Sequence, residues 1–188
     1  MQFCFKIILL GDGGVGKTCI VNRLCFNEFS LDTKLTIGVA FNTYTLNAKK
    51  NGRDIQIGLS IWDFGGQQQF RPLLPRFING AIGAIYVFDL TAFHSLDNLL
   101  KFWKPLLQEN SSNLATIMVG TKKDLCDEMN TRPIPNHTLQ DYIQKLGITQ
   151  YYEASSKTGE NIANVFQELV AQIIKLPPYD RYKIEIVD

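Results

Sequence analysis

The stretch that decides the fold is Gly11-Asp12-Gly13-Gly14-Val15-Gly16-Lys17-Thr18. It follows an apolar run, Phe3 to Leu10, which predicts a buried strand, and it precedes a segment that predicts a helix from about Lys17 to Cys25. Glycines let a loop wrap around phosphate oxygens with its N–H groups pointing inward, and a helix N-terminus adds a favourable dipole. The stretch therefore predicts a phosphate-binding loop between a strand and a helix.

Downstream of this loop, the sequence predicts a hairpin followed by alternating strands and helices. The hairpin strands run from about Val39 to Leu46 and from about Ile55 to Trp62, with a turn at Asn51-Gly52. Further strands are expected at Ala81 to Phe88, Ala115 to Val119 and Tyr151 to Ala154, and helices near Ser95 to Glu109, Thr138 to Leu146 and Ile162 to Ile174. We therefore expect a three-layer α/β fold whose mostly parallel sheet has six strands, one of them an antiparallel edge strand.

Length and composition place limits on the class of protein. A chain of 188 residues suits one domain, which we expect over residues 1–176. The formal net charge of +1 gives no field that would attract nucleic acid, so we expect no nucleic-acid partner. Four irregularly spaced cysteines fit neither a disulfide framework nor a zinc site, and Phe3 to Leu10 is too short to span a bilayer. These features favour a cytoplasmic protein.

Several polar motifs follow predicted strands. Thr121-Lys122-Lys123-Asp124 follows the strand that begins at Ala115, and Ser155-Ser156-Lys157 follows the one that begins at Tyr151. Trp62-Asp63-Phe64-Gly65-Gly66-Gln67 ends the second hairpin strand. In a parallel sheet the ligand site lies at the carboxyl ends of the strands, so these motifs should open onto the same edge as the phosphate loop.

With these motifs, the chain resembles the Ras superfamily, and its Rab branch most closely, over roughly Phe3 to Lys175. The resemblance implies the small G-protein fold and a switch that binds GTP or GDP with Mg²⁺ and hydrolyses GTP slowly. It also implies an effector, an exchange factor and a GTPase-activating protein as partners. The nucleotide-binding residues implied by the resemblance are Gly13, Gly14, Val15, Gly16, Lys17, Thr18, Cys19, Phe29, Thr36, Gly66, Thr121, Lys122, Asp124, Ser155, Ser156 and Lys157.

The resemblance also assigns roles at the base. Asp124 would accept hydrogen bonds from the N1–H and the exocyclic amine of guanine, while Lys122 lays its stem along the ring. The Ser156 N–H would meet the guanine O6 and Ser155 would steady the loop. Adenine has no amine at that position, and an unpaired carboxylate costs about 2–4 kcal/mol, which favours GTP over ATP. Thr121 departs from the usual Asn of the family, and its shorter hydroxyl is expected to make fewer contacts.

At the phosphates, the resemblance implies metal ligands and catalytic groups. Thr18, Thr36 and Asp63 would hold Mg²⁺, the last through water, and Lys17 would contact the β and γ phosphates. Gln67 would orient the attacking water and, with Lys17, is the expected catalytic group. The Gly66 N–H would grip the γ-phosphate, and Phe29 would stack edge-on against guanine. Phe64 and Gly65 depart from the usual Asp-Thr-Ala-Gly, which affects how this segment packs.

The positions of the arginines in the sequence predict the rate of GTP hydrolysis. No arginine lies between Arg23 and Arg53. The segment that leads to Thr36, which we call the first switch segment, therefore lacks an arginine of its own that could act on the γ-phosphate, an arginine finger. We expect slow hydrolysis that a partner's arginine accelerates by about 10³ to 10⁵. Gly13 leaves room for such a finger.

Two other functions stay open. A phosphate-loop kinase would need an arginine-rich lid, but Arg132 is the only arginine between Arg76 and Arg181. A nucleotide-binding scaffold with little or no hydrolysis is the second alternative, suggested by Phe64, Gly65 and Thr121.

The C-terminal segment, residues 177–188, is expected to form a mobile tail, although the alternation from Lys183 to Val187 leaves an added edge strand as an alternative. No cysteine follows Cys126 in this sequence, so no lipid anchor is expected in it, and membrane contact would be indirect, absent or dependent on a missing C-terminus.

Overall fold

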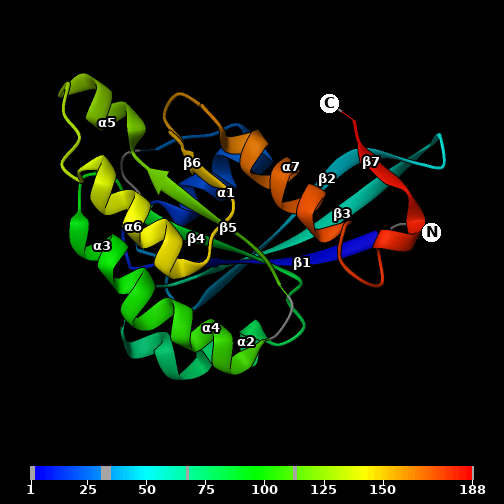
Figure 1. Ribbon diagram of the computed structural model, residues 1–188, viewed down its shortest axis with the longest axis horizontal. Coiled ribbons are helices and arrows are strands. Elements are labelled where there is room, and N and C mark those ends of the chain that lie inside the picture. The colour runs from blue at the N-terminus through cyan, green and yellow to red at the C-terminus, as the bar shows by residue number, and fades with distance from the viewer. Residues whose placement is uncertain (1–2, 31–34, 67, 112–113, 188) are drawn as a thin grey trace.

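A single twisted sheet forms the middle layer of the structure. The computed structural model describes residues 3–30, 35–66, 68–111 and 114–187, and over these the strand order is β6-β5-β4-β1-β3-β2-β7 (Figure 1). The strands are β1 (Phe3–Leu10), β2 (Val39–Lys50), β3 (Arg53–Phe64), β4 (Gly83–Asp89), β5 (Ala115–Thr121), β6 (Tyr151–Glu153) and β7 (Ile184–Ile186). The expected three-layer α/β fold is confirmed.

The helical elements connect these strands and cover both faces. They are α1 (Lys17–Phe26), the 3₁₀ turn η1 (Gln68–Leu73), α2 (Leu74–Ile78), α3 (Phe93–Asn98), the π-helical turn η2 (Leu99–Trp103), α4 (Lys104–Asn110), α5 (Lys123–Glu128), α6 (Asn136–Leu146), α7 (Ile162–Ile173) and the 3₁₀ turn η3 (Asp180–Tyr182). The sequence analysis did not predict η1, α2, α5 or η3, because elements of one or two turns show too little apolar periodicity.

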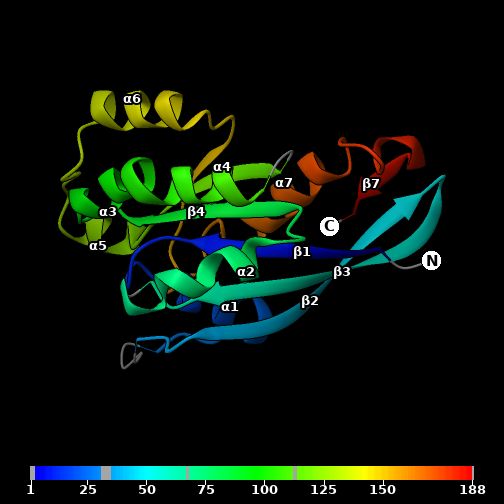
Figure 2. The same cartoon turned by 90° about the horizontal axis from the view of Figure 1, so that it is seen from below.

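The central strand β1 explains why the fold has two cores. Phe5, Ile7 and Leu9 belong to one buried cluster, which α1 and α7 complete. Ile8 and Leu10 point the other way, into a cluster that α2, α4 and α6 share. Side chains alternate between the two faces of a strand, so one apolar run serves both layers. Figures 1 and 2 show α1 and α7 on one side of the sheet and α2 and α4 on the other.

The core of the sheet is parallel, which gathers its carboxyl ends at one edge. β1 pairs in parallel with β3 and β4, and β5 pairs in parallel with β4 and β6. The loops after these strands therefore emerge together, as the sequence analysis expected. None of the helices in the described ranges combines the length and apolarity that a membrane span requires.

The hairpin is longer than predicted and has the predicted turn. β2 and β3 have 12 residues each, because pairing continues from Val39 opposite Phe64 to Lys50 opposite Arg53. Asn51 and Gly52 both adopt positive φ, at 51° and 76°. Two positive φ values match the right-handed twist of the flanking strands, which explains the Asn-Gly pair.

The prediction of six strands is wrong, since the described residues form seven. β7 pairs antiparallel with β2, with Ile184 opposite Lys50 and Ile186 opposite Ala48. The antiparallel strand β2 is therefore not an edge strand but lies between β3 and β7. The alternation of apolar and polar residues explains the added strand, because Ile184 is buried while Glu185 is exposed.

Aromatic rings hold the segment before β7 against the sheet. The ring centroids of Tyr179 and Phe5 lie 5.0 Å apart, and those of Tyr182 and Phe3 lie 5.3 Å apart. The Lys50 Nζ lies 4.4 Å from the centre of the Tyr182 ring. In place of the expected tail, this part of the chain packs onto the hairpin end of the sheet.

Candidate functional site

A cleft of about 280 Å³ opens at the carboxyl edge of the sheet. The predicted binding residues that line it are Gly13, Gly14, Gly16, Lys17, Thr18, Cys19, Phe29, Thr36, Gly66, Thr121, Lys122, Asp124, Ser156 and Lys157. Two predicted residues, Val15 and Ser155, are buried behind the wall of the cleft instead. The sequence analysis missed Ser30, Leu35, Phe64 and Leu125, which also line it.

The phosphate loop is shaped by glycines and holds its lysine inward. Gly14 and Gly16 have φ values of 78° and 97°, which only glycine adopts without strain. The Lys17 ammonium donates hydrogen bonds to the carbonyl oxygens of Gly11 at 2.8 Å and Asp12 at 2.7 Å. Burial lowers the pKa of Lys17 to about 8, although the charges of Asp63 and Asp12 act to raise it. A buried cation at the mouth of a loop is suited to an anionic ligand.

Three oxygen-bearing side chains converge beside this lysine. The Thr18 hydroxyl donates to Asp63 Oδ2 at 2.5 Å, and the Thr18 and Thr36 hydroxyl oxygens lie 2.6 Å apart. Asp63 is fully buried, and its Oδ1 has no hydrogen-bond partner among the described residues. Burial raises the pKa of Asp63, while the Thr18 hydrogen bond and the Lys17 charge lower it. A carboxylate with one unpartnered oxygen, next to two hydroxyl groups that contact each other, fits a hard cation such as Mg²⁺.

Gly66 packs directly against the phosphate loop. A Cβ at this position would lie 2.3 Å from the Asp12 carbonyl carbon and 2.3 Å from the Gly13 nitrogen, so only glycine fits. The Gly65 N–H donates to the Gly38 carbonyl at 2.8 Å, which joins the two segments that carry Gly66 and Thr36. Phe64 is fully buried, so the departure at this position forms part of the core. Gln67 lies outside the described residues.

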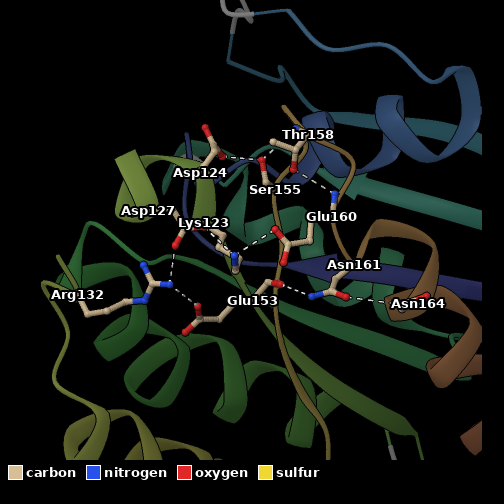
Figure 3. A network of polar contacts seen from close by, with 10 residues as sticks. All are labelled: Lys123, Asp124, Asp127, Arg132, Glu153, Ser155, Thr158, Glu160, Asn161 and Asn164. Atoms are coloured by element: carbon tan, nitrogen blue, oxygen red, sulfur yellow. Dashed lines mark hydrogen bonds and ion pairs between the residues drawn. The ribbon is translucent and has the colours of Figure 1, made fainter. Parts of the chain in front are cut away.

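The far end of the cleft contains the two loops predicted to hold the guanine base, residues 121–124 and 155–157, which we call the base loops. Asp124 Oδ1 accepts a hydrogen bond from the Ser155 hydroxyl at 2.6 Å (Figure 3). Lys122 adopts a left-handed backbone with φ 61°, and its ammonium pairs with Asp89 Oδ2 at 2.6 Å. Asp89 was not predicted as part of the site. The carboxylate and the lysine are both fixed by neighbours before any ligand arrives.

Thr121 reaches further than the sequence analysis expected. Its hydroxyl lies 2.5 Å from the Val15 carbonyl oxygen and 3.0 Å from that of Phe88. Thr121 is buried and lies beside Gly16, since a Cβ added at Gly16 would be 3.6 Å from the Thr121 hydroxyl oxygen. The shorter side chain therefore still connects the base loop to the phosphate loop.

A partly exposed ion-pair network lies behind the base loops (Figure 3). Lys123 Nζ lies 2.6 Å from Asp127 Oδ2 and 3.1 Å from Glu160 Oε2. Arg132 lies between Asp127 at 2.8 Å and Glu153 at 3.3 Å. The network joins α5 to β6 and to the loop that follows β6.

Asp12, within the phosphate loop, is a further residue to which the sequence analysis gave no role. Its carboxylate accepts hydrogen bonds from Asn98 Nδ2 at 2.5 Å and Trp103 Nε1 at 3.0 Å. The Arg71 guanidinium lies 3.9 Å from Asp12 Oδ1 and stacks 3.8 Å over the Phe102 ring. The phosphate loop is thus anchored to α3 and η2 from outside the cleft. No local pattern signals these contacts, because the partners lie far apart in the chain.

A phosphate loop, an oxygen-lined cation position and a carboxylate at the far end of one cleft define a phosphate-loop nucleotide-binding protein of the α/β class. The sequence model of the Ras family matches residues 6–175, and the chain belongs to that family. It is a small GTPase of the Rab branch. Members of this branch use GTP, GDP and Mg²⁺ and work with regulators and effectors.

Individual proteins that are similar to this chain also carry Rab names. The Ras-related protein RABA2a of Arabidopsis thaliana is 33% identical over 175 residues, which cover 93% of this chain and 77% of that protein. The Ras-related protein Rab-5B of Plasmodium falciparum (isolate 3D7) is 37% identical over 179 residues, covering 95% and 79%. The Ras-related protein Rab11A of Lotus japonicus is 32% identical over 176 residues, covering 94% and 74%.

Proposed function

We propose that this cleft binds guanine nucleotide with Mg²⁺ and that the protein switches between GTP and GDP forms by slow hydrolysis. The observation that carries the proposal is the placement of Lys17 and Asp124 on one cleft, although 107 positions separate them in the sequence. The Lys17 ammonium suits a terminal phosphate, and the Asp124 carboxylate suits the hydrogen-bond donors at the edge of a purine. A single nucleotide can occupy both ends.

At the phosphate end, Lys17 turns from the carbonyl groups of its own loop toward the β and γ phosphates. Thr18, Thr36 and Asp63 would hold Mg²⁺, since Asp63 has an unpartnered oxygen and the hydroxyl and carboxylate oxygens of the three residues are ligands that this ion prefers. Bound Mg²⁺ would neutralise charge on the phosphate oxygens. The Gly66 N–H supplies a further donor, because Gly66 already contacts the phosphate loop.

At the base end, Asp124 accepts from the N1–H and the amine of guanine. Ser155 holds the carboxylate with its 2.6 Å hydrogen bond, so the acceptor is oriented in advance. The Ser156 N–H donates to the guanine O6, and Lys122 and Phe29 flank the ring. Adenine would leave the carboxylate unpaired, at a cost of about 2–4 kcal/mol.

Hydrolysis proceeds by in-line attack of water on the γ-phosphate, with Gln67 orienting the water. The first switch has no arginine of its own, and Arg71 is stacked on Phe102 beside Asp12. A partner's arginine would therefore complete the charge stabilisation. Gly13 lines the cleft and is exposed, which leaves a path for that side chain.

Effectors would bind an apolar surface next to the two segments that carry Thr36 and Gly66. Ile37, Phe41 and Leu73 are exposed, and the Phe41 and Trp62 rings meet edge to face at 4.5 Å. Large exposed apolar groups that lie together mark interaction surfaces. Because Ile37 follows Thr36 directly, loss of the γ-phosphate would rearrange this surface. Hydrogen exchange in the GDP form and with a non-hydrolysable GTP should differ at Ile37 and Phe41.

We also propose a cytoplasmic location, in line with the four free thiols. Any peripheral membrane contact would then depend on a partner or on residues beyond this sequence. Residues 1–176 would form the switch domain, with the segment after them as an extension of its sheet.

Two measurements test the proposal. Equilibrium binding of labelled GDP and ADP should show a preference for GDP of about 10²-fold or more. Single-turnover release of phosphate from GTP should require Mg²⁺. Preference for ADP would contradict the proposal and favour a kinase, whereas tight GDP binding without any phosphate release would favour a scaffold.

A further inference from the structure

Arg23 lies on the same helix as the phosphate-binding lysine but contacts the opposite end of the cleft. It is six residues after Lys17 on α1, which places the two about 9 Å apart along the helix axis. The helix begins at the phosphate loop, so whatever Arg23 holds is fixed relative to the phosphates.

The guanidinium of Arg23 binds the loop that follows β6. Its Nε donates to the Ser156 carbonyl at 2.7 Å, and its Nη2 donates to the Lys157 carbonyl at 2.7 Å. Both residues line the cleft. A planar guanidinium with two short, charge-assisted hydrogen bonds fixes orientation as well as distance, which a lysine ammonium does not.

These two bonds set the direction of the loop's N–H groups. In a trans peptide the C=O and the N–H point to opposite sides. Holding the Ser156 carbonyl toward α1 therefore turns the Lys157 N–H away from α1. The proposed function assigns the guanine O6 to the Ser156 N–H, one peptide earlier, so the two bonds position this donor by holding the residue that carries it.

The same guanidinium also holds the start of the first switch segment. Arg23 Nη1 donates to the Asn27 carbonyl at 3.1 Å and to Asn27 Oδ1 at 2.9 Å. Asn27 ends α1 with a left-handed φ of 56°. Phe29, which lines the cleft, follows two residues later.

We propose that Arg23 is a positioning residue that controls how long guanine nucleotide stays bound. It orients the backbone of Ser156 and Lys157 for the guanine O6 and holds the chain that leads to Phe29. Because α1 starts at Lys17, Arg23 also ties both features to the phosphate site. This inference rests on the proposed function, since it concerns retention of the same nucleotide.

The first test measures release of a fluorescent GDP in the presence of Mg²⁺ and excess GDP. Arg23→Lys keeps the charge but loses the planar set of guanidinium donors. Release of GDP should be about ten-fold faster than in the unmodified protein. Arg132→Lys is the matched control, because Arg132 pairs with the carboxylates of Asp127 and Glu153 behind the loops. Its release rate should stay within about two-fold of the unmodified protein.

The second test separates positioning from a general loss of structure. The 6-thio analogue of GDP carries sulfur, a weak hydrogen-bond acceptor, in place of O6. In Arg23→Lys the preference for GDP over this analogue should fall at least about three-fold, because the loop no longer aims its N–H groups. A merely structural role would weaken both nucleotides equally and leave their ratio unchanged.

A third variant covers the case in which Arg23→Lys folds poorly. Asn27→Gly keeps the left-handed backbone and removes only the Oδ1 acceptor. Release of GDP should be about three-fold faster, and the preference for GDP over its 6-thio analogue should be unchanged. Unchanged release in Asn27→Gly, or an unchanged release rate or an unchanged preference for GDP over its 6-thio analogue in Arg23→Lys, would overturn the inference while GDP binding itself stands. Failure of the unmodified protein to bind GDP would instead overturn the proposed function, and this inference with it.

Discussion

The Thr121 hydroxyl lies 2.5 Å from the Val15 carbonyl oxygen and so connects the base loop to the phosphate loop. Thr121→Val keeps the shape and removes the donor, which leaves a buried carbonyl with one partner fewer. Such a loss costs about 1–3 kcal/mol, so GDP release should be about ten-fold faster in a fluorescence assay. Thr121→Ser keeps the hydroxyl and should behave nearly as the unmodified protein does. Equal rates for the valine and serine variants would show that the contact is unimportant.

Asp124→Asn should change which base the cleft accepts. The amide cannot accept from both guanine donors, so GDP affinity should fall about 10²-fold. Xanthosine diphosphate should gain affinity, because it carries a carbonyl where guanosine carries the amine. Asp127→Asn is the control, since Asp127 pairs with Lys123 and Arg132 behind the loop. A variant that still prefers GDP as strongly as before would disprove the role of Asp124.

Gly66→Ala should separate binding from hydrolysis. The added Cβ would lie 2.3 Å from the Gly13 nitrogen, so the segment must move away from the phosphate loop. Loss of one backbone donor to the reacting phosphate lowers single-turnover hydrolysis by about 10²–10³-fold. GDP affinity should change little, because the proposed function assigns the Gly66 N–H to the γ-phosphate, which GDP lacks. Gly58→Ala, where the nearest atom is 3.6 Å away, should hydrolyse GTP normally, and equal rates for the two variants would contradict this reading.

Ile184→Ala should weaken the fold without affecting the cleft. Ile184 is 9% exposed and lies at the hairpin end of the sheet, where β7 pairs with β2. Truncation of a buried isoleucine costs about 2–5 kcal/mol, and urea unfolding should show a loss near the lower limit. GDP release should stay at the unmodified rate. Glu185→Ala, at the exposed neighbour, should change neither quantity, and a matching loss of stability there would mean that Ile184 is not the anchor.

The predictable parts of this protein are those whose cause is local. The phosphate loop could be predicted because its glycines and Lys17 are adjacent, and the hairpin because Asn51-Gly52 specifies one type of turn. The convergence of Asp124 and Lys17 followed from parallel strands that end at one edge. These features need only the sequence order of motifs and strands.

Other parts depend on contacts between distant segments. β7 forms because Ile184 meets Lys50, 134 positions earlier, and alternation over three residues is too weak a signal by itself. The Asp12 anchor depends on the π-helical turn η2, which ends at Trp103 and carries its indole to the phosphate loop. Arg23 looked like an ordinary helix residue, because its partners are backbone carbonyls that no motif names.

The pairing of β7 with β2 affects how this molecule behaves at high concentration. A bare sheet margin presents a row of amide and carbonyl groups to which any neighbouring chain can add. By bonding along Ala48 to Lys50, the chain's own last strand occupies that row beside the hairpin tip. The margin at this point is then β7 itself, whose three residues offer a neighbouring chain few groups to pair with.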